Sequence, residues 1–126
     1  MSRLEDLLAL PDVSEVTEEV HINEKLGTFT VKPLTEQQLQ DYRVRCRKGK
    51  KDADIDGNKL NCLIIANHVV DPNLKDADFL SRAGCATAAE FINKKFKAGV
   101  TSKICNAILE ASEIGDIAEE IEAAKN

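Results

Sequence analysis

The 126-residue sequence predicts a mainly helical α+β fold, an N-terminal β-hairpin followed by a compact multi-helix domain. Three features of the sequence support this prediction. Residues 60–74 place apolar side chains on nearly every side of a helix, which is typical of a segment enclosed by its neighbours. Residues 16–32 alternate apolar and polar side chains around a turn. Several later segments begin with helix-capping patterns.

A short helix is expected at the N-terminus. Ser2 and Glu5 have the spacing of a capping box, in which two side chains satisfy free amides at a helix start. Pro11 would close this helix, because proline cannot continue the helical hydrogen-bond ladder. The buried stripe of the helix would be Leu4, Leu7 and Leu8.

The β-hairpin is predicted over residues 15–33. Apolar and polar residues alternate on both sides of a turn at residues 23–27. The apolar positions are Val16, Val20, Ile22, Phe29 and Val31. A lone hairpin is marginally stable in water, so its apolar face must pack on the helices that follow or on another subunit.

The first long helix begins after Pro33, where Thr35 and Gln38 form a second capping box. Its apolar stripe would be Leu39, Tyr42 and Cys46. The enclosed helix of residues 60–74 should stop at Asp71-Pro72, because proline pushes the preceding residue out of the helical region. Leu74 would then anchor the exit of the chain from this helix.

Two shorter helices are expected next. Asp76 can cap the first, which Gly84 ends, and Thr87 and Glu90 form a third capping box that opens the second. The first helix would carry Phe79, Leu80 and Ala83, and the second would turn Phe91, Ile92 and Phe96 inward.

The last long helix is expected from about Thr101, after a break at Ala98-Gly99, with Ile104 and Ile108 buried. Gly115 would separate it from an acidic tail helix. We therefore expect one domain over residues 1–126. Its parts are the N-terminal helix and linker (1–14), the hairpin (15–33), the helical core (34–113) and the acidic helical tail (114–126).

Composition argues against several classes of protein. The four cysteines include no CxxC pair to start a zinc site, and no signal peptide is expected before them, so we interpret them as reduced thiols in a cytoplasm. No apolar run is long enough to span a bilayer, which argues against a membrane role. The net charge of -5 disfavours generic binding to nucleic acid.

The sharpest local pattern is Asp52-x-Asp54-x-Asp56-Gly57, which resembles the start of a calcium loop. The second half of the motif fails, because Lys59 stands where an aliphatic residue is needed and Leu63 where a bidentate glutamate is needed. We therefore reject Asp52, Asp54 and Asp56 as a metal site, and no other metal site is predicted.

A basic run, from Arg43 to Lys51, follows the first long helix and supports the alternative hypothesis of a small regulatory or nucleic-acid-binding protein. Cations at the C-terminus of a helix are also favoured by the helix dipole, so a purely structural explanation is sufficient. His68 is expected to be a hydrogen-bonded core residue, and His21 lies on the polar side of a strand. No catalytic motif is present, so we predict neither an enzyme nor a cofactor.

From the hairpin onward, over roughly residues 16–115, the order of features resembles the XkdN-like family of phage tail assembly chaperones, found in contractile-tailed phages and phage-tail-like particles. The matching positions are residues 29–35 (FTVKPLT), Tyr42-Arg43, residues 64–74 (IIANHVVDPNL), Asp78-Phe79-Leu80, Gly84, residues 87–92 (TAAEFI) and Gly99. Val100 departs from the family pattern, in which a glutamate is expected after this glycine.

The resemblance implies an assembly factor with no catalytic residues. Such a protein would bind the long helical tape measure protein, keep it soluble and help tail-tube subunits polymerise around it. Its partners would be the tape measure protein and the tail-tube protein, and a homo-oligomer is compatible with this role. It would act in the cytoplasm of the bacterial host and be missing from the mature particle.

Ile114, Ile117 and Ile121 are our candidate partner-binding residues. We expect them to form part of an apolar surface for client helices, because Gly115 weakens the attachment of this segment to the core. The alternative is that the three isoleucines simply complete the core.

Overall fold

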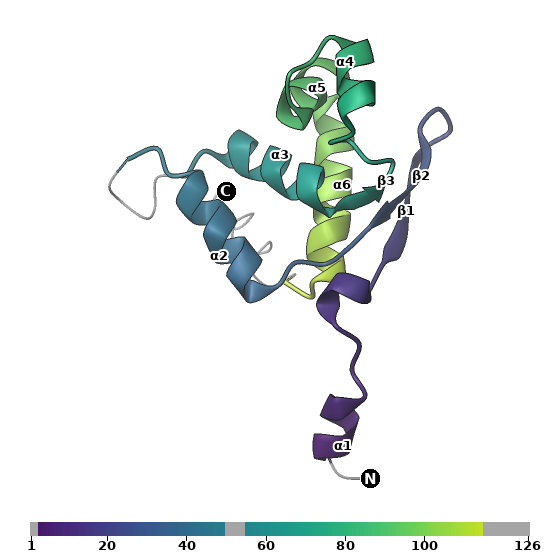
Figure 1. The fold of residues 1–126 in the computed structure, drawn as a ribbon, viewed down its shortest axis with the longest axis vertical. Coiled ribbons are helices and arrows are strands. Elements are labelled where there is room, and N and C mark those ends of the chain that lie inside the picture. Colours follow the sequence, from purple (N-terminus) through teal and green to yellow (C-terminus); the bar gives the residue numbers. More distant parts are fainter. Residues whose placement is uncertain (1–2, 50–54, 115–126) are drawn as a thin grey trace.

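The structure is a computed structural model that describes residues 3–49 and 55–114. It has the predicted α+β fold, in which a hairpin is followed by a set of packed helices (Figure 1). In chain order the described elements are α1 (Arg3–Leu8), the 3-10 turn η1 (Val13–Glu15), β1 (Glu18–Asn23), β2 (Gly27–Val31), α2 (Glu36–Arg45), α3 (Gly57–His68), β3 (Val69–Asp71), α4 (Ala77–Ala83), α5 (Ala88–Lys95) and α6 (Ala98–Ala111).

The predicted hairpin is confirmed and belongs to a small antiparallel sheet with the strand order β1-β2-β3. Val20 of β1 lies opposite Phe29 of β2. At the turn, the amide of Leu26 donates to the side-chain oxygen of Asn23 at 2.8 Å, and Gly27 adopts a φ of 73° that favours glycine. The turn is therefore specified by its own residues.

The third strand corrects the prediction for residues 60–74. The helix ends at His68, and residues 69–71 form β3, with Val69 opposite Val31 of β2. The amide of Lys32 donates to the carbonyl of His68 at 2.9 Å, which extends the pairing to the end of the helix. β-branched valines suit a strand, and hydrogen bonding to β2 outweighs the continuous apolar pattern that indicated a longer helix.

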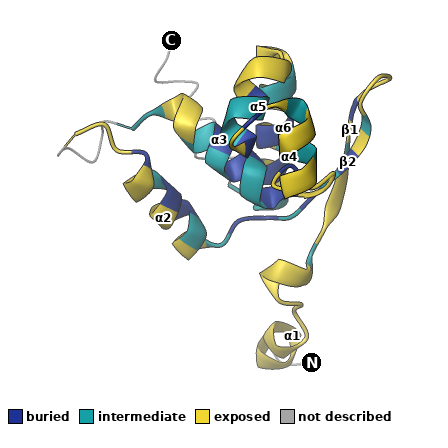
Figure 2. Cartoon of the chain, turned by 45° about the horizontal axis from the view of Figure 1, so that its top comes forward, coloured by how far each residue is buried: buried dark blue, intermediate teal, exposed yellow. Residues whose placement is uncertain are grey.

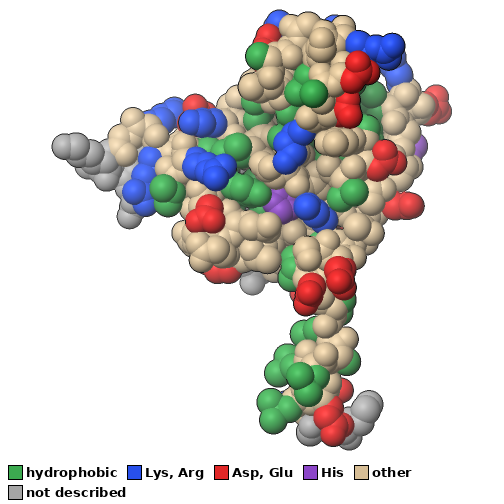
Figure 3. All heavy atoms as spheres, viewed as in Figure 1, with side chains coloured by type: hydrophobic (Ala, Val, Ile, Leu, Met, Phe, Trp, Pro, Cys, Tyr) green, Lys and Arg blue, Asp and Glu red, His purple; other side chains and the backbone are tan. Residues whose placement is uncertain are grey.

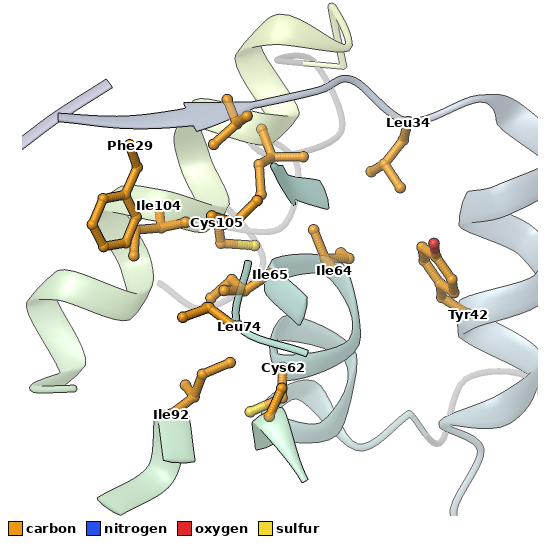
Figure 4. Packing of buried hydrophobic residues seen from close by; sticks show 14 of the residues in the cluster. Phe29, Leu34, Tyr42, Cys62, Ile64, Ile65, Leu74, Ile92, Ile104 and Cys105 are labelled. Carbon is orange, nitrogen blue, oxygen red and sulfur yellow. The ribbon is translucent and has the colours of Figure 1, made fainter. Parts of the chain in front are cut away.

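Helix α3 is nevertheless the enclosed core helix that the sequence predicts. It packs against α2, α5 and α6, and Figure 4 shows its buried residues facing side chains from these neighbours. Ile65 of α3, Ile104 and Ile108 of α6 are completely buried, and Ile92 of α5 is 1% exposed. Burying such side chains contributes about 1.5–3 kcal/mol each.

Most predicted helix caps are confirmed. At α2 the amide of Gln38 donates to the Thr35 hydroxyl at 3.2 Å, and the amide of Thr35 donates to Gln38 Oε1 at 2.9 Å, which completes a capping box. Asp76 caps α4 by accepting from the amide of Phe79 at 2.9 Å. Gly84 ends α4 with a φ of 72°.

The capping box predicted for α5 is only half formed. The amide of Glu90 donates to the Thr87 hydroxyl at 3.1 Å, as expected. The Glu90 carboxylate, however, accepts from the amide of Ala86 at 2.8 Å, one residue before the cap. This hydrogen bond and the nearby Lys94 ammonium, which lies 2.9 Å from the carboxylate, lower the pKa of Glu90 below its usual value.

Helix α6 starts earlier than predicted. Ala98-Gly99 opens its first turn instead of breaking the chain, and the break falls at Phe96 and Lys97. The helix ends in a Schellman motif, in which Glu113 has a φ of 59° and the amide of Ile114 donates to the carbonyl of Leu109 at 3.2 Å.

The N-terminal helix departs from the prediction in its packing. Leu4, Leu7 and Leu8 were expected to form a buried stripe, but they are 72%, 60% and 86% exposed. Helix α1 has only six residues and extends away from the packed helices (Figures 1 and 2). The spacing of the leucines identified an apolar face correctly, but the core formed by the described residues does not cover that face.

His68 and Tyr42 form a buried hydrogen-bonded pair. His68 Nδ1 lies 3.2 Å from the carbonyl of Lys32, which can only accept, so Nδ1 carries the proton. The other ring nitrogen, Nε2, therefore accepts from the Tyr42 hydroxyl at 2.9 Å. Burial lowers the pKa of His68, which keeps the ring neutral and able to act as this acceptor.

The loop before α2 is joined to the end of α6 by one serine. The Ser112 hydroxyl accepts from the amide of Leu34 at 2.7 Å and donates to the carbonyl of Ile108 at 2.7 Å. Leu34 is 7% exposed, so water cannot replace this acceptor easily. Ser112 thus satisfies a buried backbone group far away in the sequence.

We predict that Ser112→Ala lowers the free energy of unfolding by about 1–3 kcal/mol, because the amide of Leu34 loses its acceptor. Urea denaturation followed by circular dichroism measures this change. The matched control is Ser102→Ala, an exposed serine on the same helix, which should change stability by less than about 0.5 kcal/mol. Equal effects of the two substitutions would contradict the bridging role of Ser112.

A second prediction concerns pH. The pKa of His68 is lowered in the folded protein below its usual value of 6.5, so unfolding takes up a proton between the lowered pKa and 6.5. The free energy of unfolding should therefore fall as the pH drops through about 6.5, and this residue should contribute no pH dependence above about pH 7.5.

Denaturant titrations from pH 5 to pH 8 test this linkage. His68→Gln keeps a group that can accept from Tyr42 but removes the titration, so it should flatten the slope below pH 6.5. His21→Gln is the matched control, because His21 is exposed on β1, and it should leave the slope unchanged. If only the His21 variant altered the slope, the assignment to His68 would be wrong.

Candidate functional site

All four phenylalanines of the sequence meet at one apolar pocket. The pocket has a volume of about 270 Å³ and lies between the β1–β2 turn, the segment after β3, and helices α4 and α5. In Figure 1 these parts are at the upper end of the molecule, opposite α1. The lining residues are Lys25, Leu26, Phe29, Pro72, Asn73, Leu74, Phe79, Phe91 and Phe96.

The aromatic rings form a continuous series of contacts. Phe79 and Phe91 have ring centroids 4.8 Å apart in an edge-to-face arrangement. Phe91 and Phe96 are 5.7 Å apart, and Phe96 lies 6.5 Å from Phe29. Such pairs are worth about 0.5–1.5 kcal/mol beyond the burial of their surface, so the rings hold each other in place.

The floor and the rim of the pocket differ in exposure. Phe29 and Leu74 are 4% and 2% exposed and belong to the core, so they form the floor. Phe79 and Phe91 are half-buried, and Leu26 at the turn is 37% exposed. The rim therefore presents apolar side chains to whatever approaches from solution.

Local sequence explains why the rim residues are placed there. The Asp76 cap and Gly84 fix the two ends of α4, which carries Phe79. The Thr87 cap fixes the start of α5, which carries Phe91. The two short helices pack against each other, so the two rings meet.

The chemistry of the pocket suits aliphatic side chains. Apart from Lys25 and Asn73, its lining residues are apolar. An apolar cavity of about 150 Å³ holds a benzene-sized group, so about 270 Å³ accommodates roughly two leucine side chains. This is small for a cofactor site, and it fits a partner helix that inserts a few apolar residues.

The acidic loop holds no metal cluster in the part that the structure describes. Asp52 and Asp54 lie outside the described residues. Asp56 caps α3, because its carboxylate accepts from the amide of Lys59 at 3.1 Å. Among residues 3–49 and 55–114, no group of three His, Cys, Asp or Glu side chains could hold a metal ion.

The basic run lies at the end of α2. Arg45, Arg47 and Lys48 are exposed there, and Figure 3 shows Lys and Arg side chains gathered on this side of the molecule. Lys50 and Lys51 are outside the described residues. A helix C-terminus favours cations, so the arrangement needs no ligand to explain it. Nucleic-acid binding by this run stays a prediction.

The four thiols of the described residues are buried. Cys46, Cys62, Cys85 and Cys105 are all free and buried. Burial raises the pKa of Cys105 to about 11, so this thiol is fully protonated near neutral pH. Within the described segments, no helix is long and apolar enough to cross a membrane.

The predicted partner-binding isoleucines are only partly described. Ile114 is half-buried and packs against the core, next to the Schellman motif that ends α6. Ile117 and Ile121 lie outside the described residues. Their predicted role in binding a partner stays a prediction.

Sequence reasoning missed the pocket. It placed Phe91 and Phe96 inward, and it placed Phe79 on a short helix, but it did not bring these residues together with the turn at Leu26. Sequence spacing carries no such signal, because the lining residues come from the hairpin, the segment after β3, α4 and α5, which are far apart in the chain. The one available hint was that all four phenylalanines lie outside the enclosed helix α3.

The chain is similar to known proteins in sequence pattern and in fold. A family model described as "Phage XkdN-like tail assembly chaperone protein, TAC" matches residues 4–125. Among solved structures, the crystal structure of the protein YqbN, a structural-genomics target, matches with a TM-score of 0.62 and 14% identity, over 78% of this chain and 85% of that chain. At this identity the match shows a shared fold alone. No curated protein sequence matches the chain.

The distinction between floor and rim gives a third prediction. Phe29→Ala should lower the free energy of unfolding by about 3–5 kcal/mol, because it empties a buried site. Phe79→Ala should cost about 1–2 kcal/mol, because part of that ring already faces water. Chemical denaturation of both variants measures the difference, and equal losses would show that Phe79 is as enclosed as Phe29.

Proposed function

Since the chain belongs to the XkdN-like family of phage tail assembly chaperones, we propose that it binds the tape measure protein, keeps it soluble and assists tail-tube assembly around it. The family assignment supports the general role in tail assembly through contact with tail components. The choice of the tape measure protein as client is our proposal. The proposed action is non-enzymatic and takes place in the bacterial cytoplasm before the particle is complete.

The aromatic pocket is the observation that best supports this proposal. A tape measure protein presents long amphipathic helices, and such helices are recognised when a few apolar side chains on one face enter a groove. The pocket offers an apolar floor at Phe29 and Leu74 and an accessible rim at Leu26 and Phe79. Its aromatic rings can contact aliphatic side chains of different shapes, which suits a client that presents long amphipathic helices.

The segment after α6 is a second proposed contact. Ile114 is attached to the core at the end of α6, and Ile117 and Ile121 follow within a strongly acidic stretch of the sequence. We propose that these isoleucines extend the apolar surface offered to the client, while the acidic residues around them favour solubility.

Co-expression with the tape measure protein tests the proposal. The wild-type chain should raise the soluble fraction of the client, and Leu26→Glu should weaken client binding by about tenfold or more, because it places a carboxylate at the rim of an apolar site. Val44→Glu is the matched control: Val44 is 53% exposed on α2 and does not line the pocket. Pull-down and calorimetry provide the affinities.

Two outcomes would count against the proposal. If the client stayed insoluble with the wild-type chain, the chaperone role toward this protein would be wrong. If Leu26→Glu bound the client as tightly as Val44→Glu does, the pocket would not be the binding site. Deleting residues 115–126 tests the second contact, and unchanged client binding after this deletion would remove Ile117 and Ile121 from the surface.

A further inference from the structure

Helix α1 carries an apolar face that nothing in the described protomer covers. Leu4, Leu7, Leu8 and Leu10 are between 60% and 86% exposed, and Figure 3 shows apolar side chains gathered at this projecting end of the molecule. An isolated helix of six residues is hardly stable in water, because nucleation costs more than so few hydrogen bonds return. The helical form of α1 therefore indicates a surface on which its leucines pack.

The aromatic pocket matches this helix in size and in kind. Leu4 and Leu8 are four residues apart and lie on one face of α1, with Leu7 beside them. About two leucine side chains fill the pocket volume of about 270 Å³. The rim at Leu26 and Phe79 is apolar, so α1 would bury apolar surface on both sides of the contact.

The charges on the two surfaces are also complementary. Helix α1 carries the acidic residues Glu5 and Asp6 in its first turn, against one basic residue, Arg3. The charged residue among the lining residues of the pocket is Lys25. An acidic helix is therefore favoured over a basic one as the occupant of this site.

The geometry favours a pocket on another molecule. Helix α1 connects to the start of β1, whereas the pocket lies at the opposite end of the hairpin, beside Leu26 (Figure 1). The turn η1 intervenes between α1 and β1, and α1 extends away from the pocket. Docking within one chain would require this connection to reverse and run back along β1.

We propose that α1 of one copy of this protein docks into the aromatic pocket of a second copy. The two surfaces differ, so the contact is head-to-tail and can be repeated along further copies. One part of this inference rests on the proposed function. If client helices use the same pocket, α1 of a second copy occupies the pocket until a client helix displaces it. The chain would then keep its own apolar pocket covered between clients.

Sedimentation velocity of the full chain tests the association. The wild-type chain should associate increasingly with concentration. The triple substitution L4S/L7S/L8S should weaken this association by about tenfold or more, and so should Leu26→Glu. Val44→Ser is the matched control, an exposed apolar residue away from both surfaces, and it should associate like the wild type.

Mixing the two defective chains tests the pairing itself. The L4S/L7S/L8S chain keeps its pocket, and the Leu26→Glu chain keeps its α1, so an equimolar mixture should form heterodimers although each chain alone is monomeric. All substituted positions are exposed by more than a third in the protomer, so thermal melts should show folded chains.

Cross-linking identifies the contact. The native cysteines are buried, so an introduced thiol is the accessible one. A mixture of a Leu8→Cys chain and a Lys25→Cys chain, treated with a short bis-maleimide, should give a cross-linked heterodimer. A mixture in which Val44→Cys replaces Lys25→Cys should give at most about a tenth as much.

Three outcomes would overturn the inference: a wild-type chain that stays monomeric at all concentrations, association that survives the leucine substitutions, or cross-linking that does not distinguish Lys25 from Val44. A monomer whose Leu8→Cys/Lys25→Cys double variant cross-links within one chain would show docking in cis and would also overturn it. Client binding is measured separately, so a monomeric chain that still solubilises the tape measure protein refutes this inference and leaves the proposed function standing.

Discussion

The position of His68 is the constraint on which the rest of the fold depends. It is the last residue of α3, it is 1% exposed, and its backbone carbonyl and ring together make three hydrogen bonds to Lys32 and Tyr42. Because each of these polar groups has a partner, their hydrogen bonds offset the cost of removing them from water, and the helix can end inside the protein. The chain can then leave α3 as a strand that pairs with β2.

The aromatic pocket follows from that change of direction. After β3 the chain brings Pro72 and Leu74 to the pocket, where Leu74 forms the floor together with Phe29. The apolar core thus continues to the surface at the aromatic pocket. Helix α1 carries a second exposed apolar surface at the other end of the molecule. Both surfaces are apolar and accessible, and exposed apolar patches of this kind mark sites of interaction with other molecules.

Sequence patterns predicted the local structure correctly where a side chain or glycine acts on the backbone within a few residues. The caps at Thr35 and Asp76 and the turn at Gly84 form as predicted, because each involves groups within a few residues. Such patterns gave wrong predictions where another hydrogen-bond partner was available to the same group. Glu90 bonds to Ala86 beyond the cap, and the backbone of residues 69–71 bonds to β2 instead of continuing the helix.

The sequence by itself determined the fold class, the hairpin, the capped starts of α2, α4 and α5, and the family, because periodicity, capping and order along the chain are local or sequential properties. Only the tertiary structure decided that Leu4, Leu7 and Leu8 face water and that the four phenylalanines share one pocket. The spacing of the leucines in α1 is the same whether they pack on the chain's own core or on another molecule, so the spacing alone could not predict their exposure. Likewise, the rings of Phe29 and Phe96 lie 6.5 Å apart although the two residues are far apart in the sequence, and no spacing along the chain records this distance.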